Sequence, residues 1–224
     1  MSPYVNTHTH HVGEGINVLD VGEGGAWLEN ENVRVLAEGQ DVFYSVGLHP
    51  MKVGQAADEA LTVIRETILD ERVIAVGECG LDRRSAATME KQERVLLEQV
   101  QLAEKYHKPL IIHCVKAYSE LISIRKKSGT SVPWIIHGFN NNEQILAQLL
   151  DHGFYISIGA ALLNPRSNVF HLIRDIPLER LFLENDDREI EIPVIYEAAS
   201  CLVGLEEERL KERLWENYKK IFNK

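Results

Sequence analysis

The sequence predicts an α/β protein whose parallel strands close into a (β/α)8 barrel, and three observations support this. Short apolar runs rich in β-branched residues recur along the 224-residue chain, as strands buried on both faces should. Amphipathic segments lie between several of these runs. Eight runs in 224 residues leave 28 residues per unit, close to the roughly 30 residues of a βαβ unit. An open doubly wound sheet is the alternative.

The predicted strands are short and bounded by turn formers or by charged segments. They cover Tyr4 to Asn6, Ile16 to Val21, Val42 to Leu48, Val73 to Val76, Leu110 to Ile112, Val132 to Ile136, Phe154 to Ile158 and Leu181 to Leu183. The clearest helix runs from Met89 to His107, where apolar residues recur at helical spacing.

Two further segments complete the predicted architecture. Gly13 to Gly25 holds five of the fifteen glycines, so the helix before Val42 is expected to be short or missing. The charged segment Leu205 to Phe222 predicts a final helix that packs on the barrel. Its apolar stripe comprises Leu210, Leu214, Tyr218 and Ile221.

Composition narrows the class of protein. With 45% hydrophobic and 26% charged residues and no Pro/Gly/Ser linker, residues 1–224 are expected to form one globular domain. Three cysteines without a C-x-x-C pair predict neither disulfides nor a cysteine zinc site, which favours a reducing, cytoplasmic location. No apolar run approaches the roughly 18 residues of a membrane helix, and neither a signal peptide nor a protein partner is predicted.

The formal net charge of −10 bears on the substrate. An acidic protein repels nucleic acid through its overall field. Any substrate that carries phosphate must therefore be attracted locally. Lys52, Arg83, Arg84 and Lys116 follow predicted strand ends, where they could supply that local positive field.

Metal-ligand residue types follow the apolar runs at several strand ends. These residues are His8, His10, His49, Glu78, His113, His137, Glu184 and Asp186. In a (β/α)8 barrel the carboxyl ends of the strands open onto one face, so residues placed in this way converge. The pattern predicts a metal site at the C-terminal ends of the strands.

Six of these residues form the candidate ligand set. They are His8, His10, Glu78, His113, His137 and Asp186. Imidazole with carboxylate suits zinc, manganese or iron, and carboxylate with water suits magnesium. Six ligands exceed the three of an open mononuclear site, which favours two divalent cations bridged by a carboxylate.

Several strings of the sequence resemble one family. The strings are Asn6-Thr7-His8-Thr9-His10, Gly47-Leu48-His49-Pro50, Gly77-Glu78-Cys79-Gly80-Leu81-Asp82, His113-Cys114, His137-Gly138-Phe139 and Glu184-Asn185-Asp186. They occur in the order of the TatD family of metal-dependent deoxyribonucleases, within the amidohydrolase superfamily. The resemblance implies a TIM barrel that uses two divalent cations, magnesium, manganese or zinc, to hydrolyse phosphodiester bonds in DNA.

The same resemblance implies individual roles. One ion would be held by His8, His10 and Asp186. The other would be held by His113 and His137, with Glu78 as the bridge between the two. Asp186 would also accept the proton of the attacking water. His49 would contact the scissile phosphate. Arg83 and Lys116 are predicted to bind substrate nearby from their own positions after strand ends, not from the resemblance.

The chain also departs from the family pattern around these ligands. The family usually has Asp in place of Asn6, Arg in place of Val115 and Thr in place of Asn185. The family usually has aromatic residues where this chain has Arg83-Arg84, and Ser or Pro where it has Asp187-Arg188. The glycine that usually follows the H-x-F string is replaced by Asn140-Asn141-Asn142. The metal ligands are retained while the shell that contacts substrate is altered.

Three functions remain open. The first is a TatD-like phosphodiesterase acting on DNA. The second is a metal-dependent hydrolase of a small ester, amide or phosphoester, favoured by the net charge and the lost arginine. The third is a non-catalytic metal-binding scaffold. Asp82 is expected to orient a histidine or a loop, whereas Glu184 fits either a partner of a ligand or a solvated charge.

Overall fold

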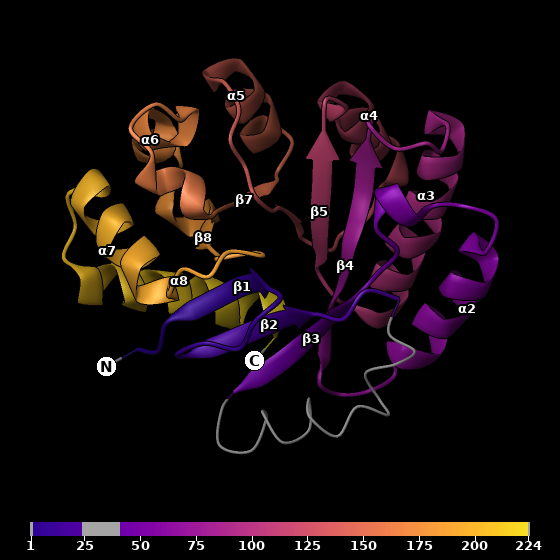
Figure 1. The fold of residues 1–224 in the computed structure, drawn as a ribbon, viewed down its shortest axis with the longest axis horizontal. Helices are drawn as coiled ribbons and strands as arrows, with labels where there is room; N and C mark the ends of the chain where they lie inside the picture. The colour runs from indigo at the N-terminus through magenta and orange to yellow at the C-terminus, as the bar shows by residue number, and fades with distance from the viewer. Residues whose placement is uncertain (1, 24–40, 224) are drawn as a thin grey trace.

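The structure is a computed structural model that describes residues 2–23 and 41–223 (Figure 1). Eight strands form one sheet in sequence order, and every neighbouring pair is parallel. The strands are β1 (Val5–Thr9), β2 (Ile16–Asp20), β3 (Val42–Val46), β4 (Val73–Asp82), β5 (Leu110–Val115), β6 (Trp134–Ile136), β7 (Tyr155–Ile158) and β8 (Leu181–Leu183). The predicted fold class is confirmed.

The sheet closes between its first and last strands. Thr9 forms a parallel bridge with Asp186. The Asp186 N–H donates to the His8 carbonyl at 3.2 Å, and the His10 N–H donates to the Asp186 carbonyl at 3.1 Å. This seam excludes the open doubly wound sheet, and it lies at the carboxyl ends of the strands.

Helices surround the strands on most sides (Figure 1). The α-helices are α2 (Ala57–Thr67), α3 (Met89–Tyr106), α4 (Tyr118–Ser128), α5 (Glu143–Asp151), α6 (Asn168–Leu172), α7 (Ile192–Val203) and α8 (Glu207–Phe222). Short 3-10 turns are η1 (Pro50–Lys52), η2 (Ala160–Leu163), η3 (Ile173–Asp175) and η4 (Leu178–Arg180). The prediction of a helix before Val42 falls largely on residues 24–40, outside the described part of the chain.

Three strands extend beyond their predicted apolar runs. β1 includes His8, β4 includes Glu78 and β5 includes His113. The ladder continues past the apolar residues, because Cys79 pairs with Ile112 and Gly80 with His113. Ladder pairing depends on backbone groups, whereas the apolar pattern records only burial. These candidate ligands are therefore held by strand backbone rather than by loops.

The connection between β1 and β2 contains no helix, which departs from the regular barrel. Residues 10–15 alone return the chain to the start of the next parallel strand. The Asn17 side chain holds this return, since its Nδ2 donates to the carbonyls of Gly13 and Gly15 at 2.9 and 3.1 Å. Gly15 has φ +85°, and a Cβ there would lie 2.4 Å from the Tyr4 carbonyl oxygen. Only glycine fits this turn.

The lower part of the barrel is filled by apolar side chains from the strand starts and from α8. Val5, Ile74 and Phe182 pack there with Tyr218 and Phe222 of the helix. The predicted stripe of α8 is buried throughout. The helix therefore closes the end of the barrel opposite the carboxyl ends of the strands, where the polar candidates lie.

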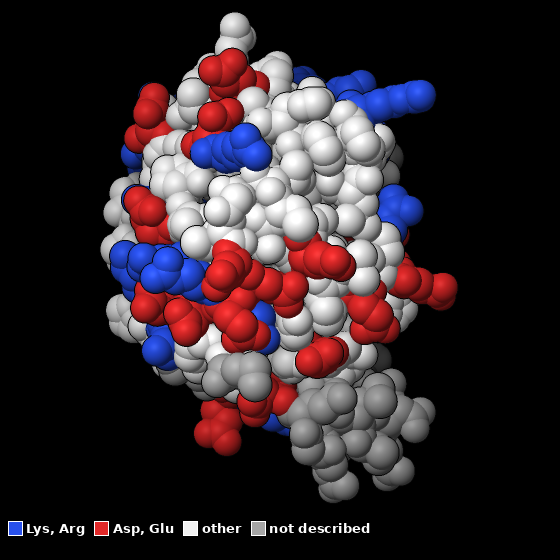
Figure 2. Space-filling view, turned by 90° about the vertical axis from the view of Figure 1, so that its left-hand side faces the viewer, with Lys and Arg blue, Asp and Glu red and all other residues white. Residues whose placement is uncertain are grey.

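No helix within the described ranges is long and apolar enough to cross a membrane. Figure 2 views the molecule from the left-hand side of Figure 1. Acidic side chains gather across this face, with fewer basic side chains between them. This distribution agrees with the net charge of −10.

Candidate metal centre

The six predicted ligands converge at the carboxyl ends of the strands. Three groups of side chains each offer ligand atoms within 4.8 Å of one another. The groups are His8 with His137 and Asp186, His8 with His10 and Glu78, and His49 with Glu78 and His113. Residues separated by up to 178 positions in the chain are thus brought together by strand order alone.

Glu78 lies at the middle of the cluster. Its Oε1 is 2.7 Å from His113 Nδ1 and 2.7 Å from His137 Nε2. Its Oε2 faces the other side, 3.7 Å from His8 Nε2. One carboxylate therefore faces imidazoles on two sides, which is the placement that a bridging ligand needs.

Asp186 reaches the β1 side of the cluster. Its Oδ1 is 3.3 Å from His8 Nε2 and 3.7 Å from His10 Nε2. The residue has φ +55°, a left-handed conformation that few residues other than glycine adopt. Such backbone conformations are held by surrounding structure and concentrate at functional sites. Here the seam hydrogen bonds to β1 hold it.

Two carboxylates orient the imidazoles from outside the cluster. Asp82 Oδ2 lies 2.9 Å from His113 Nε2, which leaves His113 Nδ1 to face Glu78. Glu184 is fully buried, with its Oε1 3.4 Å from His137 Nδ1. A carboxylate behind a ligating histidine fixes the ring and raises its basicity. The expected role of Asp82 is thus supported, and Glu184 is not a solvated charge.

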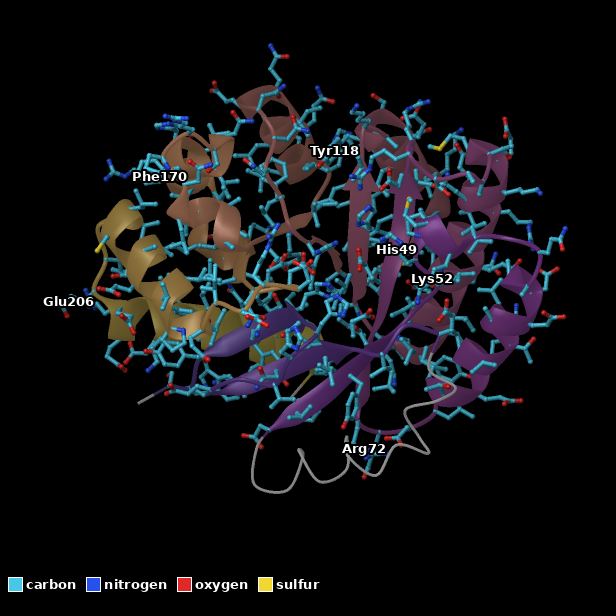
Figure 3. All side chains as sticks on the ribbon, in the orientation of Figure 1. His49, Lys52, Arg72, Tyr118, Phe170 and Glu206 are labelled. Carbon is cyan, nitrogen blue, oxygen red and sulfur yellow. The ribbon has the colours of Figure 1, made fainter. Side chains whose placement is uncertain are left out.

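The tautomer of His49 follows from its own backbone. Its Nδ1 accepts the Met51 N–H at 3.1 Å, so the proton of the neutral ring is on Nε2. That Nε2 lies 3.2 Å from Glu78 Oε1. His49 therefore presents an N–H donor to the centre rather than a free lone pair. Figure 3 shows His49 and Lys52 on the same side of the barrel.

Electrostatics keep the central carboxylates ionised. Burial favours a raised pKa for Glu78, but the charge of His137 and hydrogen bonds from three histidines hold it far below its ordinary value. Burial likewise opposes ionisation of Asp186, yet its contacts with His8 and His137 lower its pKa. Burial disfavours the charged form of His137, but Glu78 and Glu184 raise its pKa well above the ordinary value. The cluster thus stabilises positive charge at its centre.

The residues fit a cation on two independent grounds. Both ring nitrogens of His8 are buried with no hydrogen-bond partner in the described part of the chain. His113 lies between two carboxylates, with its Nδ1 2.7 Å from Glu78 Oε1 and its Nε2 2.9 Å from Asp82 Oδ2. A neutral imidazole donates to only one of them, so the other contact requires a second proton or a cation between the two atoms. Imidazole and carboxylate together suit zinc, manganese or iron.

Sequence analysis misses Asp20, the last residue of β2. Its Oδ1 accepts the backbone N–H of Glu78 at 3.1 Å, so it fixes the backbone that carries the central carboxylate. Burial raises the pKa of Asp20, and the Glu78 charge adds to this, although His8 opposes it. The signal was present, because a carboxylate directly after an apolar run is the same pattern that marks the other candidates. The predicted strand extends to Val21, so Asp20 lies inside it rather than at its end.

The predicted substrate-binding cations are engaged by other residues. Arg83 pairs with Glu120 and donates from Nε to the Lys116 carbonyl at 2.8 Å. Arg84 pairs with Asp82 at 2.7 Å. The Arg83–Glu120 pair is partly exposed, so it contributes little and can be exchanged for an anionic substrate. The Asp82 carboxylate that Arg84 contacts is fully buried and also faces His113. The substrate contacts of His49, Lys116 and Arg83 stay predictions.

Two departures from the family pattern contact each other. Asn6 Nδ2 donates to Asn185 Oδ1 at 2.9 Å, and the Asn185 N–H donates to Asn6 Oδ1 at 3.2 Å. Asn185 Nδ2 then donates to the Ile190 carbonyl at 3.1 Å. Both residues are buried, and they lie directly beside the seam that carries His8 and Asp186. The two asparagines therefore form one unit that joins β1 to the segment after β8.

This pairing predicts a strong energetic coupling. Asn6→Asp alone places a buried carboxylate against Asn185 Oδ1, and we expect it to lower the free energy of unfolding by roughly 1–3 kcal/mol. Adding Asn185→Thr supplies a hydroxyl donor and should recover much of the loss. Urea unfolding of the wild type, both single variants and the double variant measures the coupling, expected at about 1–3 kcal/mol. Additive effects of the two substitutions would contradict the pairing.

A barrel with histidine and carboxylate ligands gathered at its strand ends defines a metal-dependent hydrolase. The family model described as TatD related DNase matches residues 12–223. The chain belongs to this family, in agreement with the resemblance of its motifs.

Two similar proteins, one of which also has a crystal structure, give more detail. YjjV of Escherichia coli K12, an uncharacterized metal-dependent hydrolase, is 31% identical over 159 residues, which are 69% of this chain and 61% of YjjV. The 3'-5' ssDNA/RNA exonuclease TatD of the same organism is 27% identical over 179 residues, 75% of this chain and 69% of TatD. The crystal structure of YjjV superposes with a TM-score of 0.80 at 23% identity, covering 94% of this chain and 87% of YjjV. The sequence match thus spans about three fifths of YjjV.

Proposed function

We propose that this metal-dependent hydrolase is a phosphodiesterase that cleaves DNA. The observation that carries the proposal is that the Glu78 carboxylate has imidazole side chains on both of its sides, His113 and His137 on one and His8 on the other. A pair of cations about 4 Å apart is the usual means of clamping the attacking and leaving oxygens of a phosphoryl group. The similarity to a protein named as an ssDNA/RNA exonuclease supports DNA as the substrate.

In this proposal the ligands divide as the family pattern implies. His8, His10 and Asp186 would hold one ion, and His113 and His137 would hold the other, with Glu78 shared between them. When bound, magnesium, manganese or zinc ions polarise the phosphoryl group and lower the pKa of the attacking water.

The other steps belong to side chains of this protein. The water oxygen forms a bond to phosphorus as the P–O bond to the leaving oxygen breaks. Asp186 accepts the proton that the water loses and returns it to the leaving oxygen. Its lowered pKa keeps it in the ionised form that such a base needs. His49 donates its Nε2 proton in a hydrogen bond to a phosphoryl oxygen, as its tautomer permits. Lys116 and Arg83, at the ends of β5 and β4, attract the phosphate.

Hydrolysis of a small ester, amide or phosphoester is the second candidate function. The net charge of −10 and the acidic face in Figure 2 favour it, because a long polyanion is repelled by such a surface. Val115 stands where the family pattern has an arginine, so the chain lacks one cation that could attract phosphate. A non-catalytic scaffold is disfavoured, since both Glu78 and Asp186 are retained.

A substrate panel distinguishes these functions. The purified protein is assayed with bis-p-nitrophenyl phosphate, end-labelled single-stranded DNA, and amide and lactone substrates, each with magnesium, manganese and zinc. We expect metal-dependent cleavage of the two phosphodiesters, weakening with salt along a shallow slope because few cations contact the phosphate. A preparation of Glu78→Gln controls for contaminating nucleases. Turnover of amides or lactones without nuclease activity would instead establish the second function.

Two broader features belong to the same proposal. We place the enzyme in the cytoplasm, which is supported by its three free cysteines, two of them buried and one exposed. Residues 1–224 are proposed to act as one catalytic domain, since a single sheet runs from Val5 to Leu183.

A further inference from the structure

Glu78 lies where β4 leaves regular pairing with both of its neighbours. On the β5 side the register shifts between Val76 and Cys79, and on the β3 side the last pair is Val46 with Val76. Gly77 and Glu78 therefore have no register partner on either strand. A buried backbone N–H outside the ladder needs another acceptor. The Glu78 N–H is thus a point at which a side chain can fix the backbone beneath the central carboxylate.

Asp20 supplies that acceptor from two strands away. Its strand, β2, pairs with β3 and not with β4, so its side chain crosses the end of β3 to reach the Glu78 N–H at 3.1 Å. Gly47, directly after β3, leaves room for this approach. A Cβ there would lie 2.7 Å from the Gly77 carbonyl carbon and 2.9 Å from the Glu78 carbonyl oxygen. The backbone of Glu78 therefore lies between Gly47 and the Asp20 carboxylate.

The recorded hydrogen bonds of Asp20 all come from neutral donors. Besides the Glu78 N–H, the Gly22 N–H and the Ser45 hydroxyl approach the same Oδ1 at 3.4 and 3.5 Å. Within residues 2–23 and 41–223, Asp20 forms no ion pair and lies outside the three groups of candidate ligands. Its contribution there is the acceptance of hydrogen bonds, which an uncharged oxygen can also provide.

We propose that Asp20 is a positioning residue of the metal centre, and that its Oδ1 acceptor rather than its charge sets the affinity for both ions. The Glu78 side chain branches one atom from the bonded nitrogen, so a shift of that N–H displaces the carboxylate between His8 and His113. Residues that only orient a ligand commonly change metal affinity by about 10- to 100-fold. The inference rests on the proposed two-ion function, since only a bridging carboxylate passes the effect to both sites.

The test measures manganese binding to the dialysed protein by calorimetric titration, so it does not depend on turnover. Asp20→Ala leaves the Glu78 N–H without its acceptor, and we expect the affinity for both ions to fall about 10- to 100-fold. Asp20→Asn keeps an acceptor oxygen of the same reach and should bind both ions within about threefold of the wild type.

Asp70→Ala is the matched control. Asp70 also accepts a backbone N–H, that of Arg72 at 2.9 Å, but it does so just before β4 begins, at the opposite end of the barrel. Asp70→Ala therefore makes the same chemical change and loses the same kind of contact. It should keep the wild-type affinity for manganese even where it lowers the thermal stability.

Two results would overturn the proposal. One is wild-type manganese affinity in Asp20→Ala, and the other is a loss in Asp20→Asn as large as that in Asp20→Ala, which would assign the effect to the charge. Circular dichroism of the metal-free proteins checks the fold. If Asp20→Ala does not fold, Asp20→Asn still decides, because a folded variant that binds both ions as the wild type does supports the acceptor role, and one that has lost them contradicts it.

Turnover of bis-p-nitrophenyl phosphate is measured in parallel on the wild type. Its absence contradicts the phosphodiesterase function, while the manganese titration still decides the role of Asp20.

Discussion

Glu78→Gln is expected to release together the two metal ions that we propose this carboxylate bridges. The Glu78 carboxylate faces imidazoles on both of its sides, at 2.7 Å and 3.7 Å, so a neutral amide weakens both ion sites at once. Substituting a residue that only orients a metal ligand lowers metal affinity by about 10- to 100-fold. We expect the loss of a ligand itself to lower the affinity for each ion by at least about 100-fold. Elemental analysis after dialysis and calorimetric titration with manganese measure the loss.

The matched control is Glu66→Gln, on the exposed face of α2 and far from the strand ends. It makes the same chemical change and should leave the metal content at the wild-type level. Retention of one full equivalent by Glu78→Gln would show that the carboxylate serves a single ion. The bridging role would then be wrong.

Asp186→Asn is expected to lower turnover while metal binding is largely retained. The substitution removes the negative charge and the proton acceptor while keeping an oxygen donor of nearly the same shape. Asparagine also tolerates the left-handed backbone conformation at φ +55°, so the seam with β1 should survive. General-base assistance is worth 10²- to 10⁴-fold, and we expect turnover to fall by about that factor.

The ion held by Glu78, His113 and His137 should remain in Asp186→Asn, and its thermal unfolding should resemble that of the wild type. Asp187→Asn is a close control, because it makes the same change one residue away on a side chain that is 68% exposed. Steady-state turnover of bis-p-nitrophenyl phosphate and metal content are measured on all three proteins. Near-normal turnover with both ions bound would assign water activation to the metals alone.

The class of fold was predictable from the sequence because buried strands leave a periodic trace, and the convergence of the candidate ligands because these residues follow the apolar runs. Buried parallel strands require continuous apolar runs, and a barrel aligns their carboxyl ends, so His8, Glu78 and His113 could be placed near one another from spacing alone. The α8 stripe was predicted for the same reason, since a helix buries one side every 3.6 residues.

Tertiary structure alone decided the features that depend on contacts across the chain. The helix-free return from β1 to β2 depends on Asn17 and on Gly15 beside Tyr4, a local fit that leaves no periodic signal. Asn6 and Asn185 look like separate losses in the sequence, yet they form one hydrogen-bonded pair 179 residues apart. The sequence determined which side chains are present at the strand ends. Hydrogen bonding in three dimensions decided how each is oriented, because the partner of a buried polar group can come from any part of the chain.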